Sequence, residues 1–574
     1  MSLLRVLPED RIIAMHSGET VLQALKRAGI AISSECNGQG LCGKCTVLVE
    51  DPASVPPTPH PRIAAEDEAK GLRLACRIEP KQDLTITLQD IETEKEADAD
   101  WILGSERFRL KRIHPAVSRT QEAHGPAAVI EGDPIGAPLP WPQDSPLLGA
   151  ALDIGTSTLV VSIYDLESGH ELGSARGLNP QRRYGSDVLS RIQKGSSPEG
   201  LRELSGLVRT RLNELLESAC RQAGLFQDSL FEVTLGGNTT MLQLLAEIDP
   251  APLGRSPFRH SLEGGRSYPA QDFGLAAHPQ ARVYLPPIID AYAGTDISAG
   301  LLAVDFFAAG PPLLFMDIGT NGEMALRSEE GLLAASTAAG PAFEGGGLRS
   351  GMGAAEGAVE QVWLDKGRLR FSTLGNAPAK GICGSGLIDC IACLLRLGRL
   401  SPSGRLLRPD EGPDLPKGSR GEAIELEGSA AFRLQGDVLL TQQDIRSFQL
   451  AKSAVRTGLD LLLQRADLPP ESLSALVLAG GFGRSLRPLN LEIVGILPGG
   501  TAGRLRFAGN TSLAGSAQLL LDTAARRRLE AAVPGIEYVR LAREDGFMDW
   551  FVENMEFPEP SLEPQVQAHA TEES

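Results

Sequence analysis

The stretch LLGAALDIGTSTLVVSIYDLESG, residues 147–169, is an apolar run that turns through a polar tip and returns as a second apolar run. Apolar runs on both sides of a Gly-Thr-Ser tip predict a β-hairpin. The pattern recurs in PLLFMDIGTNGEMALRSEEG, residues 312–331, where Asp317 follows Asp153 after 164 residues. An internal repeat at this distance predicts two copies of one domain.

Each predicted tip carries the groups that bind phosphate. Gly155 and Gly319 allow a ligand to approach the backbone closely, and the hydroxyl and N–H groups beside them can bind phosphate oxygens. Asp153 and Asp317 each supply a carboxylate that can hold a magnesium ion through water. Two such tips facing each other would hold the phosphates of a nucleotide from both sides.

A third segment, ALVLAGGFG at residues 475–483, is an apolar run that ends in glycines. An adenosine can lie against bare backbone of this kind, although a tight strand-to-helix turn would give the same pattern. Rossmann dinucleotide binding fits poorly because no G-x-G-x-x-G opens the first strand-helix unit. The two hairpins and the glycine segment, in this order, resemble the actin, sugar kinase and Hsp70 superfamily of ATPases.

A cysteine cluster lies near the N-terminus. Cys36, Cys42 and Cys45 fall within ECNGQGLCGKC, residues 35–45, and Cys76 follows after thirty intervening residues. Three cysteines in one loop and one distant cysteine are typical of a [2Fe-2S] ferredoxin, whose two irons need four thiolates. Structural zinc is the alternative, but it usually takes its ligands from two close pairs, and only Cys42 and Cys45 form one.

The flanking sequence predicts a small sheet with one helix. A hairpin is expected within residues 3–14, a helix from Val21, and strands at Thr46–Glu50 and Leu84–Leu88. Residues 1–92 resemble the β-grasp ferredoxins. We therefore predict a multidomain α/β protein in four segments: a ferredoxin-like domain at 1–92, a linker or small reduced middle domain at 93–149, an actin-like ATPase domain with two RNase H-like halves at 150–558, and a disordered tail at 559–574.

Composition excludes several classes of partner. The formal charge of −18 disfavours nucleic acid, whose binding depends on Lys and Arg. The sequence has no signal-peptide pattern and no apolar run long enough to span a membrane, which predicts a cytoplasmic protein that does not bind membranes. Cys390 and Cys393, with Cys383 nearby, invite a second metal site, but buried inert thiols are the commoner reading of such an apolar run.

Taken together, several segments resemble the reductive activators of corrinoid proteins. The resemblance implies ATP-dependent reduction of inactive Co(II) to Co(I) on a corrinoid protein of a methyltransferase system, by one-electron transfer from the [2Fe-2S] cluster. It also implies an external low-potential electron donor, and it leaves the oligomeric state open, a homodimer included. The segments are residues 236–258, 286–300, 317–323, 338–347, 381–390, 441–458 and 507–515.

The resemblance also implies residue roles and the cofactors [2Fe-2S], ATP and Mg²⁺. Four thiolates would hold the cluster: Cys36, Cys42, Cys45 and Cys76. Asp153 and Asp317 are the expected catalytic carboxylates, with Glu323 either positioning water or lying on a surface strand. The expected nucleotide-binding residues are Gly155, Thr156, Ser157, Gly319, Thr320, Asn321, Gly480, Gly481 and Phe482.

Two other functions remain open from the sequence. One is a small-molecule kinase whose ferredoxin domain senses redox state, and the other is an ATP-dependent activator of a different low-potential metalloenzyme. The short segment 93–149 departs from family members that carry a longer linker and a middle domain, so the docking geometry also stays open.

Overall fold

The chain forms two compact units, Met1–Asp100 and Trp101–Ser574, called here the N-terminal and C-terminal units. The structure is a computed structural model. It describes residues 2–7, 11–16, 18–28, 30, 32, 45–57, 63, 65–80, 82–88, 113–122, 125–130, 139–140, 145–184, 187–308, 310–319, 321–480 and 486–559.

The N-terminal unit contains a five-stranded mixed sheet in the order β2-β1-β5-β3-β4, and helix α1 contributes side chains to its core. Strands β1 and β2 are antiparallel, and β1 and β5 are parallel. The expected hairpin, helix and two strands are therefore confirmed. The strands are β1 (Leu3–Leu7), β2 (Arg11–Ala14), β3 (Thr46–Val49), β4 (Leu72–Leu74) and β5 (Leu84–Leu88), and the helices are α1 (Val21–Arg27) and α2 (Ala65–Ala69).

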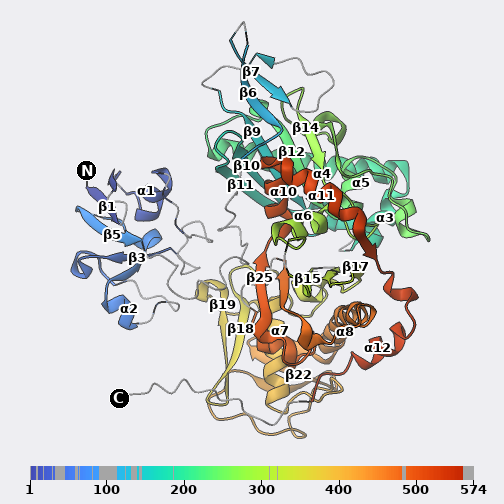
Figure 1. Cartoon of the computed structure of the whole chain (residues 1–574). Coiled ribbons are helices and arrows are strands. Elements are labelled where there is room, and N and C mark those ends of the chain that lie inside the picture. The colour runs from blue at the N-terminus through green and yellow to red at the C-terminus, as the bar shows by residue number, and fades with distance from the viewer. Residues whose placement is uncertain are drawn as a thin grey trace. The chain divides into compact units, whose positions relative to one another are not determined.

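The C-terminal unit contains two six-stranded sheets. The first, in the order β11-β10-β9-β12-β14-β13, defines lobe 1, and the second, in the order β25-β24-β15-β16-β17-β26, defines lobe 2 (Figure 1). Lobe 1 contains β9 (Leu148–Ile154), β10 (Thr158–Asp165), β11 (Glu171–Leu178), β12 (Leu230–Gly237), β13 (Arg266–Pro269) and β14 (Arg282–Leu285). Lobe 2 contains β15 (Leu313–Ile318), β16 (Gly322–Arg327), β17 (Leu332–Thr337), β24 (Ala475–Ala479), β25 (Leu505–Gly509) and β26 (Ile536–Tyr538).

The two sheets repeat one topology. In each, three consecutive antiparallel strands are followed by two strands added in parallel next to the first, so β9, β10, β11, β12 and β14 correspond to β15, β16, β17, β24 and β25. Asp153 and Asp317 lie at equivalent places, one residue before the end of the first strand. The predicted duplication of an RNase H-like domain is confirmed.

Helices cover both sheets and lie between the lobes. Helix α4 packs on β10 and β11, and α8 packs on β16 and β17. Helix α8 begins with a capping box in which Thr441 and Asp444 satisfy each other's backbone N–H groups, which fixes its start. The helices are α3 (Val188–Gly195), α4 (Pro198–Gln222), α5 (Thr239–Leu245), α6 (Thr295–Ala303), α7 (Gly384–Arg396), α8 (Gln442–Arg465), α9 (Pro488–Ile493), α10 (Thr511–Leu521), α11 (Thr523–Ala532) and α12 (Phe547–Glu553).

Helices α6 and α10 cross between the two lobes (Figure 1). Their contact depends on a glycine, because a Cβ added at Gly515 would lie 1.9 Å from the carbonyl oxygen of Ala299. A Cβ at Gly300 would lie 2.8 Å from the hydroxyl of Thr511. The backbones therefore approach more closely than any side chain would allow.

Gly515→Ala should destabilise the C-terminal unit by about 1–3 kcal/mol, because the added methyl group forces the two helices apart. Gly206→Ala on α4 is the matched control, since a Cβ there meets nothing within 4 Å. This control should raise stability by about 0.5–1 kcal/mol through helix propensity. Urea denaturation measures both variants, and equal stability changes would contradict the crossing geometry.

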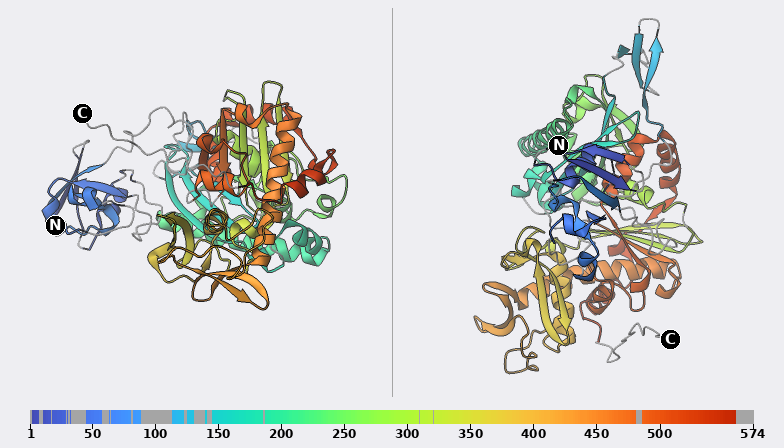
Figure 2. Two further views of the ribbon diagram at one scale, coloured as in Figure 1. Left: turned by 90° about the horizontal axis from the view of Figure 1, so that it is seen from below. Right: turned by 90° about the vertical axis from the view of Figure 1, so that its left-hand side faces the viewer.

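The described residues of the C-terminal unit also form three small sheets. Two of them extend lobe 2, and the third, in the order β6-β7-β8, extends outward from lobe 1, as Figure 2 also shows for its two longer strands. The base of this third sheet packs on the end of α10 through Leu520 and Leu521. The strands are β18 (Ala358–Asp365), β19 (Arg368–Thr373), β20 (Gly381–Ile382), β21 (Glu422–Leu426), β22 (Ser429–Gln435), β23 (Val438–Thr441), β6 (Val117–Glu122), β7 (Gly125–Ile130) and β8 (Leu139–Pro140).

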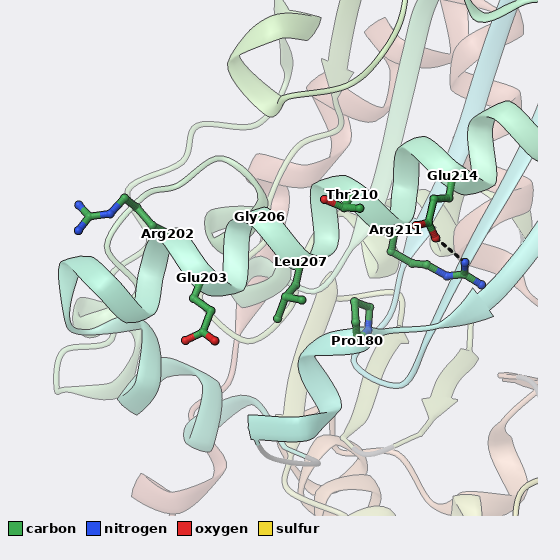
Figure 3. Close-up of a pocket in the computed structure, with 8 residues that line it drawn as sticks. All are labelled: Pro180, Arg202, Glu203, Gly206, Leu207, Thr210, Arg211 and Glu214. Atoms are coloured by element: carbon green, nitrogen blue, oxygen red, sulfur yellow. Dashed lines mark hydrogen bonds and ion pairs between the residues drawn. The ribbon is translucent and has the colours of Figure 1, made fainter.

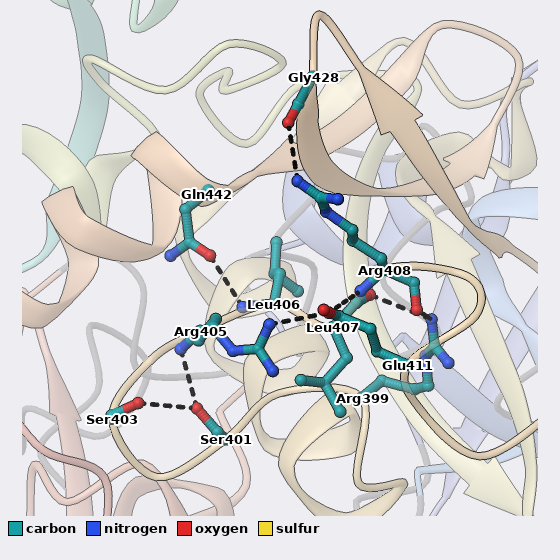
Figure 4. A network of polar contacts seen from close by, with 10 residues as sticks. All are labelled: Arg399, Ser401, Ser403, Arg405, Leu406, Leu407, Arg408, Glu411, Gly428 and Gln442. Atoms are coloured by element: carbon teal, nitrogen blue, oxygen red, sulfur yellow. Dashed lines mark hydrogen bonds and ion pairs between the residues drawn. The ribbon is translucent and has the colours of Figure 1, made fainter.

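A polar network orders the loop that precedes β21 (Figure 4). The guanidinium of Arg399 donates to the carbonyl oxygens of Leu407 at 3.1 Å and Arg408 at 2.9 Å. Gln442, the first residue of α8, accepts a hydrogen bond of 2.8 Å from the backbone N–H of Leu406. The network fixes this loop to lobe 2, and none of the predicted site residues belongs to it.

The last described residues lie along α8. The side chain of Gln449 donates to the carbonyl oxygen of Met555 at 2.7 Å, and the ammonium of Lys452 donates to that of Glu556. Phe557 is buried and stacks on Phe448, with ring centroids 6.2 Å apart. Phe557 is therefore part of the lobe 2 core, and hydrogen bonds hold residues 555 and 556 against α8.

Candidate functional site

The two predicted hairpin tips come together across the lobes. The first tip, Gly155–Ser157, joins β9 to β10, and the second, residues 319–321, joins β15 to β16. Ser157 Oγ donates a 2.7 Å hydrogen bond to Oε2 of Glu344, a lobe 2 residue in the short helix Pro341–Glu344. The first tip thus meets lobe 2 beside Gly319 of the second tip, and the residues that both lobes contribute there are called here the cleft. Thr320 lies outside the described residues.

Asp153 is held by donors from the start of α10. Its two carboxylate oxygens each accept a 2.8 Å hydrogen bond, one from the Asn510 amide and one from the Ser512 hydroxyl. Gly236 on β12 makes this approach possible, because a Cβ there would lie 2.4 Å from Ser512 Oγ. Burial raises the pKa of Asp153, and the two hydrogen bonds oppose that rise.

Three more carboxylates gather behind the second tip. Burial raises the pKa of Asp317 to about 7, with Asp296, Asp153 and Glu344 adding repulsion. Burial likewise raises the pKa of Asp296, the second residue of α6, to about 7. Glu323 on β16 is buried beside both and its pKa is raised well above its usual value, so it is not a surface strand residue.

Gly480 brings the glycine segment beside the second tip. It follows β24 with a φ of +104°, a conformation that glycine adopts without strain. A Cβ there would lie 3.0 Å from the Ile318 carbonyl oxygen and 3.2 Å from Asp317 Oδ1. Gly481 and Phe482 lie outside the described residues.

Side chains from lobe 1 fix the shape of the first tip. The buried guanidinium of Arg191 on α3 donates to the carbonyl oxygen of Thr156 at 2.5 Å. The Asn179 amide donates to the carbonyl oxygen of Gly155 at 2.9 Å. Burial lowers the pKa of Arg191 to about 10, so the guanidinium stays charged at neutral pH behind the tip.

The residues of the cleft fit a phosphate chain with a hard cation. Its carboxylate oxygens are the ligands that Mg²⁺ prefers. Asp153, Asp296 and Asp317 are half-buried and repel one another, so a bound cation would balance charge that the protein leaves close together. Gly480 leaves bare backbone next to the carboxylates.

Two of the four predicted cluster ligands are described. Cys45 directly precedes β3, and Cys76 lies in the short helix Ala75–Arg77; both are buried. A hydrogen bond from Cys76, together with backbone N–H groups of Cys76 and Ala75, lowers the pKa of Cys45 to about 6. This environment suits a thiolate ligand. Cys36 and Cys42 lie outside the described residues.

The remaining described cysteines are buried thiols. Burial raises the pKa of Cys390, Cys393 and Cys220, which disfavours the thiolate that binds metal. Within the described part of the chain, no group of three or more His, Cys, Asp or Glu side chains has the arrangement of a metal site. A shallow hollow on α4, which includes Gly206 and the Arg211–Glu214 pair, holds none of the predicted site residues (Figure 3).

Five residues that the fold brings to the cleft have no role predicted from the sequence. Four of them lie in segments that carry the family resemblance, so the signal was present, but only the fold gives their positions. Arg191 lies outside those segments. The five residues are Arg191, Asp296, Glu344, Asn510 and Ser512.

Comparison with known proteins agrees with this architecture. A family model described as a 2Fe-2S iron-sulfur cluster binding domain matches residues 4–81. A model of the RACo middle region matches residues 148–308, and one of the C-terminal domain of RACo, the ASKHA domain, matches residues 312–568. The protein is thus an iron–sulfur domain joined to an actin-like ATPase domain.

Relatives that match most of the chain are known. The corrinoid activation enzyme RamQ of Eubacterium limosum is 32% identical over 425 residues, which cover 72% of this chain and 71% of that protein. A [Co(II) methylated amine-specific corrinoid protein] reductase of Methanosarcina barkeri is 27% identical, covering 66% of this chain and 70% of that one. A solved structure of a reductive activator for a corrinoid, iron-sulfur protein is 28% identical, with a TM-score of 0.70, covering 97% of this chain and 98% of that chain.

The chain belongs to the family of reductive activators of corrinoid proteins. It is an enzyme of corrinoid activation with a [2Fe-2S] domain. Among the described residues, no helix is both long enough and apolar enough to cross a membrane.

Proposed function

We propose that this protein uses ATP to reduce the inactive Co(II) form of a corrinoid protein to Co(I), passing one electron from its [2Fe-2S] cluster. The observation that supports this most is the meeting of two phosphate-type hairpin tips at half-buried carboxylates, in a chain that also carries an iron–sulfur domain. The partner would be a corrinoid protein of a methyltransferase system. An external low-potential donor would reduce the cluster.

The energy of electron transfer gives a reason for coupling it to a nucleotide. Plant-type ferredoxin clusters have reduction potentials of about −400 mV. Moving one electron uphill by about 100 mV costs about 2.3 kcal/mol. If the corrinoid is harder to reduce than the cluster, a nucleotide-driven change in the acceptor's environment can supply that difference.

Each part of the cleft has a proposed task. Gly155, Thr156 and Ser157 on one tip, with residues 319–321 on the other, would bind the phosphates. Asp153 and Asp317 would hold a hydrated magnesium ion, which supplies charge neutralisation when bound.

The acidic residues behind the second tip would orient water. Asp296 and Glu323 lie beside Asp317 and are well placed for this task. Residues 480–482 would border the adenosine. The division of the chain into segments 1–92, 93–149, 150–558 and 559–574, and a cytoplasmic location, also stay proposals.

The decisive experiment mixes the reduced protein with a cognate Co(II) corrinoid protein and follows the Co(I) absorption band with and without ATP. We expect the band to appear only with ATP. A band that never appears with any cognate partner would sink the proposal. Phosphorylation of a small molecule, unaffected by the corrinoid partner, would favour the kinase alternative instead.

The acidic cleft predicts a pH dependence of cation binding. Asp296 and Asp317 have pKa values of about 7 in the folded protein, above the usual value of about 3.9 for an unfolded aspartate. Their protonation favours the folded state below the unfolded pKa, and this contribution is lost as the pH rises towards 7. Millimolar MgCl₂ should therefore raise the Tm more at about pH 8 than at about pH 6. Potassium chloride of equal ionic strength is the control, and an equal MgCl₂ effect at both pH values would contradict the charge cluster.

A further inference from the structure

Glu344 connects the two lobes through the first tip. It ends the short helix Pro341–Glu344 in lobe 2, and its Oε2 accepts the 2.7 Å hydrogen bond from Ser157 Oγ of lobe 1. The two residues are 187 positions apart in the sequence. Residues this far apart in the sequence come into hydrogen-bonding distance only when both lobes have folded.

The other oxygen of the same carboxylate faces the second tip. A Cβ added at Gly319 would lie 3.3 Å from Glu344 Oε1. Ser157 and Gly319 both lie in the hairpin tips, which are equivalent in the two lobes. The Glu344 carboxylate therefore lies between the tips, where a phosphate held from both sides would also have to lie.

Charges around Glu344 oppose one another. The buried guanidinium of Arg191 in lobe 1 attracts it. Asp317 in its own lobe is repelled by it, and this repulsion contributes to the raised pKa of Asp317. Glu344 thus holds negative charge at the point where both tips and the charge of Arg191 meet.

A phosphate entering this place meets Glu344 in two ways. Its oxygens compete with the carboxylate for the Ser157 hydroxyl, and its charge is repelled by the carboxylate at short range. A divalent cation removes the second obstacle, because it attracts both groups.

We infer that Glu344 is a specificity-determining residue that makes the cleft accept a nucleoside triphosphate with its divalent cation and reject the metal-free triphosphate. The inference rests on the proposed function, in that it takes this cleft as the nucleotide site. It assigns to Glu344 a role of its own, separate from the tips and from Asp153 and Asp317.

Calorimetric titration of the full-length protein tests the inference. ATP is titrated once with excess MgCl₂ and once with EDTA. The measured quantity is the Kd with EDTA divided by the Kd with MgCl₂, which is large when the protein rejects metal-free ATP. Glu344→Gln keeps the shape and an oxygen that can accept from Ser157 but removes the charge. This variant should lower the ratio by about tenfold or more relative to the natural protein.

Two further variants separate charge from folding. Glu344→Asp keeps the charge and should keep most of the ratio. Glu356→Gln removes an equal charge from an exposed position twelve residues along the chain and should leave the ratio unchanged. A thermal unfolding curve for each variant, measured without nucleotide, shows whether the fold is retained.

The outcomes are distinct. A ratio that stays the same in Glu344→Gln, while the natural protein binds ATP, overturns the role of Glu344 and leaves the proposed function standing. If Glu344→Gln does not fold, the ratio measured with Glu344→Asp decides. This variant keeps the charge, so a fall of about tenfold in its ratio contradicts the inference. No heat of ATP binding to the natural protein under either condition overturns both the inference and the proposed function.

Discussion

Replacing Asp317 with asparagine should reduce ATP-dependent formation of Co(I) by about 10²-fold or more and leave the visible spectrum of the iron–sulfur cluster unchanged. Asparagine has nearly the same shape but no charge to hold a hydrated cation. Asp317 lies at the end of β15, where Asp153, Asp296 and Glu344 all act on its pKa. Stopped-flow or steady-state absorbance of the Co(I) band measures the effect.

Asp365→Asn is the matched control for this prediction. Asp365 ends β18 on an exposed surface, and its replacement removes the same charge from lobe 2 without touching the cleft. Full activity of Asp317→Asn would remove this residue from the nucleotide site. Loss of the iron–sulfur spectrum would instead mean that a change in the C-terminal unit disturbs the N-terminal unit, so the two are not independent.

The second large effect is expected from Cys76→Ala. Cys76 is buried in the short helix Ala75–Arg77, next to Cys45, and its loss would remove one of four thiolate ligands. We expect anaerobically reconstituted protein to lose most of its iron and colour and to form no Co(I). ATP binding by the C-terminal unit should remain, as measured by calorimetry.

Cys220→Ala provides the control for the loss of a thiol. Cys220 is as buried as Cys76, but it lies on α4 of lobe 1, among apolar side chains. Its replacement should leave iron content unchanged. A Cys76→Ala protein that keeps its iron would contradict the ligand assignment, and zinc in place of iron in the natural protein would contradict the cluster itself.

The sequence was sufficient for the parts of the fold that local pattern determines. The hairpins around Asp153 and Asp317 could be predicted because apolar alternation and a glycine tip are properties of consecutive residues. Their repetition at a fixed distance then predicted two lobes of one topology. The hairpin, helix and strands of the N-terminal unit follow from the same kind of pattern.

The contacts that complete the cleft could not be predicted in this way. Asn510 is 357 residues from Asp153, and the hydrogen bond between them depends on α10 returning to lobe 1. Glu344 reaches Ser157 only because two lobes close on each other. Neither position has a local pattern that gives its role, although both lie in segments that resemble the family.

Residues 93–149 show a second reason why part of the fold could not be predicted from the sequence. Their charged and Pro-rich composition predicts a linker or a small domain, and nothing local gives β6, β7 and β8. These strands are stabilised by packing on Leu520 and Leu521, almost 400 residues further along the chain. For Cys36, Cys42, Thr320, Gly481 and Phe482, which lie outside the described residues, the predictions stand as made.

The attachment of residues 554–557 to α8 has a practical consequence for making the protein. A purification tag fused shortly after Phe557 would follow directly on a buried ring, and a truncation before Glu556 would deprive the buried ammonium of Lys452 of its carbonyl acceptor. Expression vectors should therefore keep the chain at least through Pro558 and place a spacer before any C-terminal tag.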